Sequence, residues 1–542
     1  MDRGDVTVPV LIIGGGPIGL GLAADLGWRG VECLLIEKND GTIYHPRADT
    51  ENCRTMEFCR RWGIAEKVRA AGTPPDFPRT VIIVTALTGF EIARIERPTH
   101  GGEAPLPYTP ERTQRCNQIR FDPILRELAE SFPSVRLRYK CRFESFVQNA
   151  DGVTAEVTDV VSGRRERIHA QYMIACCGGQ SSVAKSLGIG FDGEPVLDHN
   201  VNIMFRVPEL WKYHDKGKCA FNFIMGPEGN WGNVMEVNGD DLWRLGVSGF
   251  DEPVDPKKID PHHYIRRAIG TDIPYEIISV NPWTCRSLVA KSYGRGRVFL
   301  AGDAVHQHSP AGGIGMNTGM GDVVDLSWKL DAALSGWAGP DLLASYEAER
   351  LPVGRRNVRV ATENFFLSRQ QFDEPLTPIV DATPAGEALR RELGKSLVEQ
   401  RSKVHIFDGM ALGYRYDQSP IIWPDGVTPP PEMKTDYIAN ACVGARAPHA
   451  WLADGRSILD LFGRGFVLLR FGGGEADTAG LEKAARAHGV PFTVCDIADP
   501  EIQKLYERRL VLVRPDGHVG WRDDAPPADP AAVIDRLRGA AT

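Results

Sequence analysis

The order of apolar and polar positions predicts that the chain opens with a strand, a helix and a second strand. Residues 8–16 read VPVLIIGGG, an uninterrupted apolar run typical of a strand that is buried on both faces. An apolar helical pattern follows at once, and VECLLIE at 31–37 is the next predicted strand. A third buried strand, RVFLAGD at 297–303, precedes a glycine-rich loop and an amphipathic helix. Strands that alternate with helices in this way indicate a parallel α/β sheet.

Other patterns dominate the middle and the end of the chain. Between residues 191 and 284 apolar and polar positions alternate, as in DLWRLGVSGF, and glycine turns separate the runs, which predicts antiparallel strands. The last hundred residues combine strand patterns such as GRGFVLLRF with the helical pattern DTAGLEKAARAHG, so a compact α/β unit is expected. A proline-rich stretch at 419–434, SPIIWPDGVTPPPEMK, precedes this unit and is typical of a linker.

Composition and charge exclude several classes of protein. The 542 residues are 42% hydrophobic and 25% charged, which is ordinary for globular proteins, and the length predicts two to four domains. A net charge of −8 provides no basic surface for nucleic acid. No run of about 18 apolar residues occurs, so no membrane span is expected.

The N-terminus and the cysteines indicate a cytoplasmic protein. The chain carries acidic residues at its start and passes directly into the first strand, so we expect no signal peptide. The eleven cysteines are scattered without a C-x-x-C pair or zinc-ligand spacing. Neither a metal site nor a disulfide framework is therefore expected, which agrees with a reducing compartment.

The first strand ends in a glycine pattern that predicts a dinucleotide site. Gly14 permits the tight turn, Gly16 lets the backbone approach a pyrophosphate, and Gly19 lets the helix pack on the strand. Glu37 ends the second strand, where a carboxylate can accept hydrogen bonds from a ribose hydroxyl. A glycine-tight turn beside a surface glutamate is the alternative. Because strand, turn, helix, strand and acid occur in the required order, we predict an adenine dinucleotide here.

A second motif separates FAD from NAD. Residues 296–330, GRVFLAGDAVHQHSPAGGIGMNTGMGDVVDLSWKL, resemble the G-D-A-x-H…P…G-G-x-G-x-N motif of group A flavoprotein monooxygenases, the p-hydroxybenzoate hydroxylase-like aromatic hydroxylases. In that family the aspartate, here Asp303, holds the ribityl chain of the flavin and the loop lies along the flavin ring. The resemblance also implies cofactor contacts for Pro310, Gly313, Gly315 and Asn317. We interpret His306 and His308 as packing or hydrogen-bonding residues rather than catalysts.

Two further segments fit the family and one departs from it. Arg47 matches the arginine that the family places near the cofactor phosphates and the incoming nicotinamide, and Gln118 matches a glutamine beside the FAD. Each could alternatively be an ordinary polar residue at a helix start. Cys177 stands where the family has the aspartate of an Asp-Gly pair, which it associates with FAD and the nicotinamide cofactor. The substitution therefore bears on NAD(P)H binding, and an inert buried thiol is favoured over a reactive one.

The resemblance predicts an α/β protein with a Rossmann-like FAD-binding domain, an inserted antiparallel β-sheet substrate domain and a thioredoxin-like C-terminal domain, as in the phenol hydroxylase branch. The expected domains are residues 1–80, 108–190 and 285–345 for FAD, 81–107 and 191–284 for substrate, 346–430 for a helical region and linker, and 440–542 for the thioredoxin-like domain. Because the last domain lacks C-x-x-C, we expect it to serve packing or dimerisation and to be dispensable for chemistry.

The inserted sheet is expected to cover the flavin and to enclose a substrate pocket. Candidate pocket walls are Phe221, Phe223, Trp231, Met235 and Trp243, each of which could instead belong to the sheet core. A phenol has a pKa of about 10 and needs a base or oriented hydrogen bonds to react at neutral pH. RADTENCRTME at 47–57 is similar to the phenol hydroxylase segment whose aspartate contacts the substrate hydroxyl, so Asp49 is the candidate base. Alternatively, Asp49 is a helix N-cap or a loop aspartate.

The resemblance implies an FAD-dependent monooxygenase that uses NAD(P)H and O2 to hydroxylate a phenolic or related aromatic small molecule through a flavin hydroperoxide. A homodimer is the only protein partner that the sequence suggests. A flavin oxidase or dehydrogenase without oxygen insertion is the alternative, which the substitution at Cys177 keeps open. A binding protein that has lost its chemistry conflicts with the intact glycine pattern and Asp303.

Overall fold

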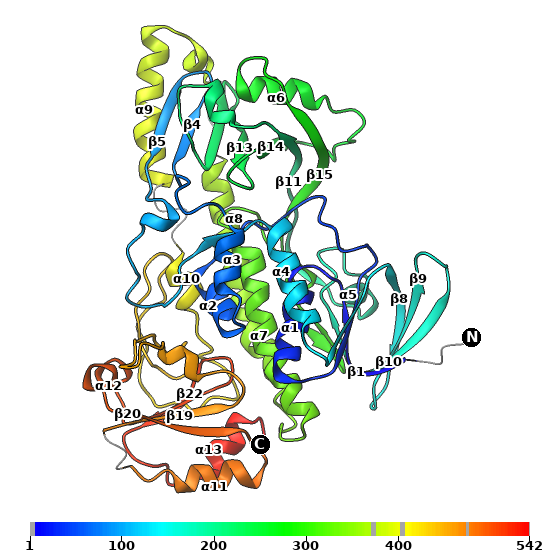
Figure 1. The fold of residues 1–542 in the computed structure, drawn as a ribbon, viewed down its shortest axis with the longest axis vertical. Helices are drawn as coiled ribbons and strands as arrows, with labels where there is room; N and C mark the ends of the chain where they lie inside the picture. The colour runs from blue at the N-terminus through cyan, green and yellow to red at the C-terminus, as the bar shows by residue number, and fades with distance from the viewer. Residues whose placement is uncertain (1–5, 370–374, 402–406, 473–475, 541–542) are drawn as a thin grey trace.

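Segments far apart in the sequence build one mainly parallel sheet. Figure 1 shows the computed structural model, which describes residues 6–369, 375–401, 407–472 and 476–540. Strands pair in parallel in the order β17-β10-β1-β2-β7, while β8, β9 and β16 add antiparallel pairs. The strands of this first sheet are β1 (Val6–Ile13), β2 (Cys33–Ile36), β7 (Val135–Arg138), β8 (Cys141–Gln148), β9 (Val153–Asp159), β10 (Arg165–Ala175), β16 (Gly294–Arg295) and β17 (Val298–Leu300). The predicted Rossmann-like α/β unit is confirmed.

Helices cover this sheet and connect it to the rest of the molecule. The helix α1 contacts both α4 and α7, and α7 packs against α8 in the centre of the molecule (Figure 1). The helices of this part are α1 (Pro17–Arg29), α2 (Cys53–Arg61), α3 (Ala65–Ala71), α4 (Gln118–Glu130), α5 (Ser182–Ser186), α7 (Ile314–Leu334) and α8 (Ser345–Ser368). The short strands β3 (Thr50–Glu51) and β6 (Gln114–Arg115) pair beside α2 and bring two distant loops together.

A second, mostly antiparallel sheet forms the upper part of Figure 1. Its order is β18-β15-β11-β14-β13-β12-β4-β5, and only the β12–β4 pair is parallel among the pairs described. Its strands are β4 (Val81–Val84), β5 (Glu91–Ile95), β11 (Phe191–Arg206), β12 (Phe221–Gly226), β13 (Gly229–Glu236), β14 (Leu242–Phe250), β15 (Glu276–Ala290) and β18 (His306–Gln307). Because β15 runs through the expected boundary at residue 284 and pairs with β18, the sheet is continuous with the glycine-rich loop.

The two faces of the second sheet differ in chemistry. One face is apolar and packs against α6 (Pro261–Ile269), while α9 (Pro384–Arg401) packs against β5. Trp231 and Trp243 belong to this apolar core, so their predicted place in the substrate pocket is wrong. Trp243 alternates with Arg244 and therefore points away from the cavity face. Trp231 is the extra residue of a β-bulge, because Ile224 pairs with Gly232 and Met225 with Asn230, and the bulge turns it toward α6.

The C-terminal unit is a four-stranded sheet in the order β20-β19-β21-β22 with helices packed against it. Its elements are β19 (Phe466–Phe471), β20 (Phe492–Ile497), β21 (Leu510–Val513), β22 (Val519–Asp523), α11 (Ala479–Ala487), α12 (Pro500–Tyr506) and α13 (Pro530–Leu537). The proline-rich stretch before it, which follows α10 (Asp408–Leu412), is no free linker. Ile421 and Ile422 are buried, and the Trp423 N–H donates to the Gly520 carbonyl at 2.8 Å.

Two buried ionic clusters join the C-terminal unit to the first sheet's helices. Arg446 donates to both carboxylate oxygens of Glu57 on α2, at 2.9 Å from its Nε. Arg514 donates to both carboxylate oxygens of Glu349 on α8, at 2.5 and 2.9 Å. Removing one partner of a buried ion pair costs about 3–5 kcal/mol, because the other charge stays uncompensated. These pairs argue against a C-terminal unit that folds separately, while its dispensability for chemistry stays a prediction.

The stability of the protein is expected to fall as the pH drops from 7 to 5, because of buried His518. Burial lowers its pKa from 6.5 to about 4, although Asp516 beside it opposes the shift. Above the unfolded pKa the stabilisation is complete, and it is lost as the pH falls toward the folded pKa, because only the unfolded chain binds the proton. For His518 the loss between pH 7 and pH 5 is about 2 kcal/mol.

Urea unfolding at several pH values measures this dependence. His518→Gln should flatten the slope between pH 7 and pH 5, while His263→Gln, on the exposed surface of α6, should leave it unchanged. An unchanged slope in His518→Gln would mean that other groups cause the pH dependence.

Candidate active site

A cavity of about 1550 Å³ lies between the first sheet and the polar face of the second. Ligand pockets in proteins usually measure about 300–1,000 Å³, so this cavity has room for more than one ligand. The glycine turn after β1, the loop 43–52 and the loop 301–317 line one side of it. Strands β11–β15 of the second sheet line the other side.

The glycine turn fits a dinucleotide at each of its three predicted positions. Gly14 has a φ of +110°, and a Cβ on it would lie 2.5 Å from the Cys176 carbonyl oxygen. A Cβ on Gly19 would lie 1.9 Å from the Gly14 carbonyl oxygen, so only glycine allows this approach of helix and strand. A Cβ on Gly16 would meet no protein atom within 4 Å and would enter the cavity. Gly16 therefore leaves space for a ligand rather than for the protein.

Two helix N-termini open on the cavity without a capping side chain. Gly16 is the N-cap of α1 and Gly313 the N-cap of α7, and neither helix has an acidic residue in its first turn. Unpaired N–H groups and the helix dipole make such ends favourable for anions. Pro310, Gly313 and Gly315 all line this part of the cavity, as the resemblance implies.

Glu37 lies at the cavity edge directly after β2. Its Oε2 accepts a hydrogen bond from the Gly15 N–H at 2.9 Å, and its Oε1 accepts one from the Asn39 N–H at 2.8 Å. These bonds orient the carboxylate and leave further lone pairs, since each carboxylate oxygen accepts about two hydrogen bonds. A ribose hydroxyl can therefore be accommodated at Glu37.

Asp303 is a cavity carboxylate whose hydrogen-bonding positions are open to a ligand. It lies in the 3-10 helix η3 (Gly302–Ala304), is half-buried, and lines the cavity. Burial raises its pKa, while His306 and Arg47 act in the opposite direction. No described residue donates a hydrogen bond to it, and an unpaired carboxylate at such a depth is unfavourable. Ribityl hydroxyls would supply the missing donors, so the residues present fit FAD.

We expect Asp303→Ala to weaken FAD binding by about 10- to 100-fold, because a hydrogen bond to a charged group contributes about 1.5–3 kcal/mol. Titration of the apoprotein with FAD, followed by flavin fluorescence, measures the effect. Asp303→Asn keeps an acceptor and should lose less affinity. Equal FAD affinity in wild type and Asp303→Ala would remove Asp303 from the flavin site.

The side chains of Gln118 and Asn317 are occupied by protein partners. Gln118 accepts from the Arg47 backbone N–H at 2.8 Å and donates to Asp122 at 3.0 Å. The Asn317 amide nitrogen donates to the Thr50 and Gly313 carbonyl oxygens, and its oxygen accepts from the Asn52 N–H and the Thr55 hydroxyl. All hydrogen-bonding positions of this amide are therefore used. Both residues line the cavity, but they hold its loops in place. Arg47 is exposed on the cavity wall.

Asp49 lies in the cavity beside a buried arginine. The Nε and Nη2 of Arg115 lie 3.0 and 2.8 Å from the Asp49 Oδ2, and Arg115 also pairs with buried Glu236. Burial acts to lower the pKa of Arg115, but Asp49 and Glu236 raise it above its ordinary value. Burial lowers the pKa of Arg244, which faces the same group of charges. Asp49 thus belongs to a fixed network with one side open to the cavity.

The interpretation of Asp49 as a helix cap is wrong. Asn52 is the N-cap of α2, and its side chain accepts a hydrogen bond from the Thr55 N–H at 2.9 Å. Asp49 lies in the loop before β3, and the β3–β6 pair fixes it next to Arg115.

The cavity face of the second sheet carries aromatic and polar side chains together. Phe221 and Phe223 on β12 and Met235 on β13 lie there, as predicted for the pocket, and the Arg115 guanidinium lies 4.6 Å from the centre of the Phe221 ring. The sequence reasoning missed further residues that line the cavity, namely Arg115, Asn200, Asn202, Asn233, Arg244 and Trp283. Polar residues at every second position of an otherwise apolar strand were the signal that could have found most of them.

Cys177 lies on the cavity wall next to the glycine turn. Burial raises the pKa of the Cys177 thiol. The thiol donates a hydrogen bond to the Ser181 Oγ at 3.1 Å. A thiol with a raised pKa is a poor nucleophile, so the geometry favours an inert cysteine.

Fold and cavity together define a flavin-dependent hydroxylase. Residues 7–361 match the family described as FAD binding domain, and residues 440–541 match the family described as aromatic-ring hydroxylase, C-terminal. The chain belongs to this family of FAD-dependent aromatic-ring monooxygenases, and the predicted family, fold class, cofactor FAD and enzyme class are confirmed.

Several characterised proteins resemble the chain along its whole length. It is 33% identical to tetracenomycin B2 monooxygenase-dioxygenase of Streptomyces olivaceus, over 99% of this chain and 98% of the relative. It is 31% identical to 4-methyl-5-nitrocatechol 5-monooxygenase of Burkholderia sp, over 98% and 97%. A structure of the rebeccamycin biosynthetic enzyme RebC with reduced flavin matches with a TM-score of 0.91 and 39% identity, over 99% and 100%.

Across the described residues, no helix combines the length and the apolar character that crossing a membrane requires.

Proposed function

We propose that this monooxygenase hydroxylates a multi-ring, electron-rich aromatic compound that carries a phenolic oxygen. The cavity of about 1550 Å³ supports this proposal most directly, because it extends from the residues assigned to FAD across the polar face of the second sheet and so has room for a ring system beside the cofactor. The relatives named above act on compounds that range from a nitrocatechol to tetracenomycin B2. Phe221, Phe223 and Met235 supply apolar contacts for rings, while the asparagines of β11 and β13 supply hydrogen bonds to ring oxygens.

The proposed FAD site uses the glycine turn and Glu37 for the adenosine diphosphate part and Asp303 for the ribityl chain. The uncapped N-terminus of α7 lines the same cavity and would favour negative charge on bound flavin. Bound FAD, reduced by NAD(P)H, supplies the activation of O2. Apolar side chains on the cavity wall, such as Phe221 and Phe223, would limit the access of water to the reacting groups.

Asp49 is the proposed hydrogen-bond acceptor for the substrate hydroxyl. The Arg115 pair holds the carboxylate in one orientation, and the side that faces the cavity remains open. A phenol that donates to this carboxylate gains electron density on its ring, which makes the ring a better nucleophile. Arg244 is half-buried and forms no ion pair with a carboxylate among the described residues, so it can stabilise the charge that develops on the substrate oxygen.

NAD(P)H consumption by the purified protein, measured across a panel of one-ring and multi-ring phenols, tests the proposal. Products are identified by mass, and labelled dioxygen shows whether one oxygen atom enters the ring. Stimulated consumption with a labelled product supports the proposal. Consumption that yields only hydrogen peroxide and a dehydrogenated product would support the oxidase alternative.

The cytoplasmic location and the homodimer remain predictions. All eleven cysteines are free thiols in the structure, which supports a reducing compartment. Size-exclusion chromatography with light scattering measures the oligomeric state.

A further inference from the structure

Asp322, in the middle of α7, is a fully buried carboxylate that holds the Gly302–Asp303 turn in place. Its Oδ2 accepts hydrogen bonds from the Gly302 N–H at 3.0 Å and from His306 Nε2 at 2.8 Å. Gly302 directly precedes Asp303, so Asp322 fixes the backbone of the residue assigned to the ribityl chain. Burial would raise the pKa of Asp322, but His306 and Arg350 lower it, which keeps the carboxylate ionised.

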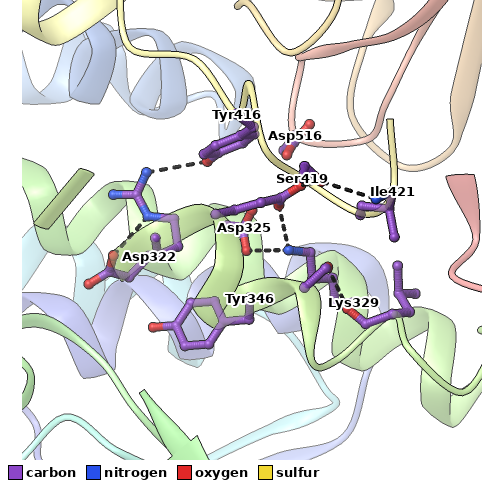
Figure 2. A network of polar contacts seen from close by, with 12 residues as sticks. Asp322, Asp325, Lys329, Tyr346, Tyr416, Ser419, Ile421 and Asp516 are labelled. Atoms are coloured by element: carbon purple, nitrogen blue, oxygen red, sulfur yellow. Dashed lines mark hydrogen bonds and ion pairs between the residues drawn. The ribbon is translucent and has the colours of Figure 1, made fainter. Parts of the chain in front are cut away.

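Arg350 on α8 continues this network toward the C-terminal unit. Its Nε donates to the Asp322 Oδ1 at 2.9 Å and its Nη2 donates to the Thr318 carbonyl at 3.0 Å. Its Nη1 donates to the Tyr416 hydroxyl oxygen at 3.2 Å (Figure 2). A single guanidinium thus connects Asp322, the Thr318 carbonyl in α7 and the segment that leads into the C-terminal unit.

Tyr416 is anchored on the C-terminal unit. Its backbone N–H donates to the Gly444 carbonyl at 3.1 Å, and its ring centre lies 4.4 Å from that of His518. The Arg514 guanidinium lies 5.2 Å from the same ring and pairs with Glu349, the neighbour of Arg350 in sequence. The position of Tyr416 therefore depends on the C-terminal unit.

The neighbouring carboxylates are already neutralised by cations. Asp325, Glu349 and Asp516 lie close enough together to suggest a metal site. However, Lys329 donates to Asp325 (Figure 2) and to Glu349, and Arg514 donates to Asp516. Burial raises the pKa of Asp325 well above its usual range, which favours its neutral form. This cluster therefore fastens α7 and α8 to the C-terminal unit and gives no argument for a metal ion.

We propose that Asp322, Arg350 and Tyr416 are positioning residues through which the C-terminal unit sets the place of Asp303 in the flavin site. This inference rests on the proposed flavin role of Asp303. None of the three residues is assigned to the chemistry. Their effect on the cofactor arises because Asp322 holds the Gly302 N–H, Arg350 holds the Thr318 carbonyl, and these two buried side chains pair with each other.

The experiment compares two variants that each remove one buried tyrosine hydroxyl. Tyr416→Phe breaks the bond to Arg350 and keeps the ring. Tyr506→Phe is the matched control, because its hydroxyl donates to the Pro448 carbonyl at 2.7 Å within the C-terminal unit, away from Arg350. Both variants should melt slightly earlier than wild type. Only Tyr416→Phe should raise the FAD dissociation constant, by about 2- to 10-fold, which corresponds to one net hydrogen bond.

Three further readouts separate positioning from general destabilisation. The visible spectrum of bound flavin, its reduction potential, and the hydrogen peroxide released per NAD(P)H should change in Tyr416→Phe and not in Tyr506→Phe. Arg350→Lys keeps the charge beside Asp322 but loses the fork geometry, so it should resemble Tyr416→Phe with a larger effect. Equal FAD affinity and spectra in Tyr416→Phe, Arg350→Lys and wild type would overturn the inference.

The failure of the inference can be distinguished from failure of the proposed function. If Asp303→Ala loses FAD while Tyr416→Phe and Arg350→Lys do not, the flavin site stands and the positioning role is wrong. If Asp303→Ala binds FAD normally, the assignment of Asp303 fails, and the inference fails with it. If no aromatic compound is hydroxylated, the proposed function fails, while the FAD titrations still decide the positioning role.

Discussion

Gly16→Val should give a folded but colourless protein that binds FAD roughly 100-fold more weakly than wild type. Gly16 has φ and ψ values of −80° and −177°, which valine adopts without strain, and no protein atom lies within 4 Å of its Cβ position. The added side chain therefore spares the fold and occupies the space where the backbone meets the pyrophosphate. Flavin absorbance per protein and circular dichroism measure the two effects separately.

Gly190, directly before β11, provides a matched control. Gly190→Val places a side chain at 3.6 Å from the Lys291 side chain on the exposed surface, outside the cavity, and should keep full FAD occupancy. Normal flavin content and spectrum in Gly16→Val would show that the glycine turn does not hold the cofactor.

Asp49→Asn should reduce hydroxylation by about 10²- to 10⁴-fold while FAD binding survives. Asparagine keeps the size and an oxygen acceptor for Arg115, but it removes the carboxylate that is proposed to accept a hydrogen bond from the substrate hydroxyl. Reduced flavin still reacts with oxygen, so NAD(P)H oxidation should continue and release hydrogen peroxide. Product formed per NAD(P)H is the decisive measurement.

Asn52→Ala separates a chemical role from a local structural one. Because Asn52 is the cap of α2, its loss should cost about 1 kcal/mol of stability without changing the product formed per NAD(P)H. Should Asp49→Asn stay fully coupled and merely melt earlier, Asp49 acts only as the partner of Arg115 and the base lies elsewhere.

The sequence predicted best those parts of the site that are continuous along the chain. The glycine turn and the Asp303 loop each consist of a strand end, a turn and a helix start, so their local pattern determines their geometry. Asp49 was proposed from one continuous segment that resembles phenol hydroxylases, but its partner Arg115 comes from a separate segment through the short β3–β6 pairing. Two-residue strands leave no periodicity to detect.

The errors have equally specific causes. Trp243 could have been placed correctly, because it alternates with Arg244 along β14. Trp231 could not, since a one-residue bulge changes its face and strict alternation gives the opposite answer. The buried ion pairs of the C-terminal unit were also hidden, because Glu57 and Arg446 are 389 positions apart and look like ordinary surface charges in the sequence.

The two buried ion pairs also limit the order in which parts of the protein can fold during its synthesis. Glu57 and Glu349 emerge from the ribosome before their partners Arg446 and Arg514, which belong to the last hundred residues. Because synthesis adds about 5–20 residues per second, Glu57 and Glu349 remain without these arginine partners for many seconds. Both buried pairs can therefore form only after most of the chain has been synthesised, and the last part of the chain to leave the ribosome completes the enclosure of Glu57 and Glu349.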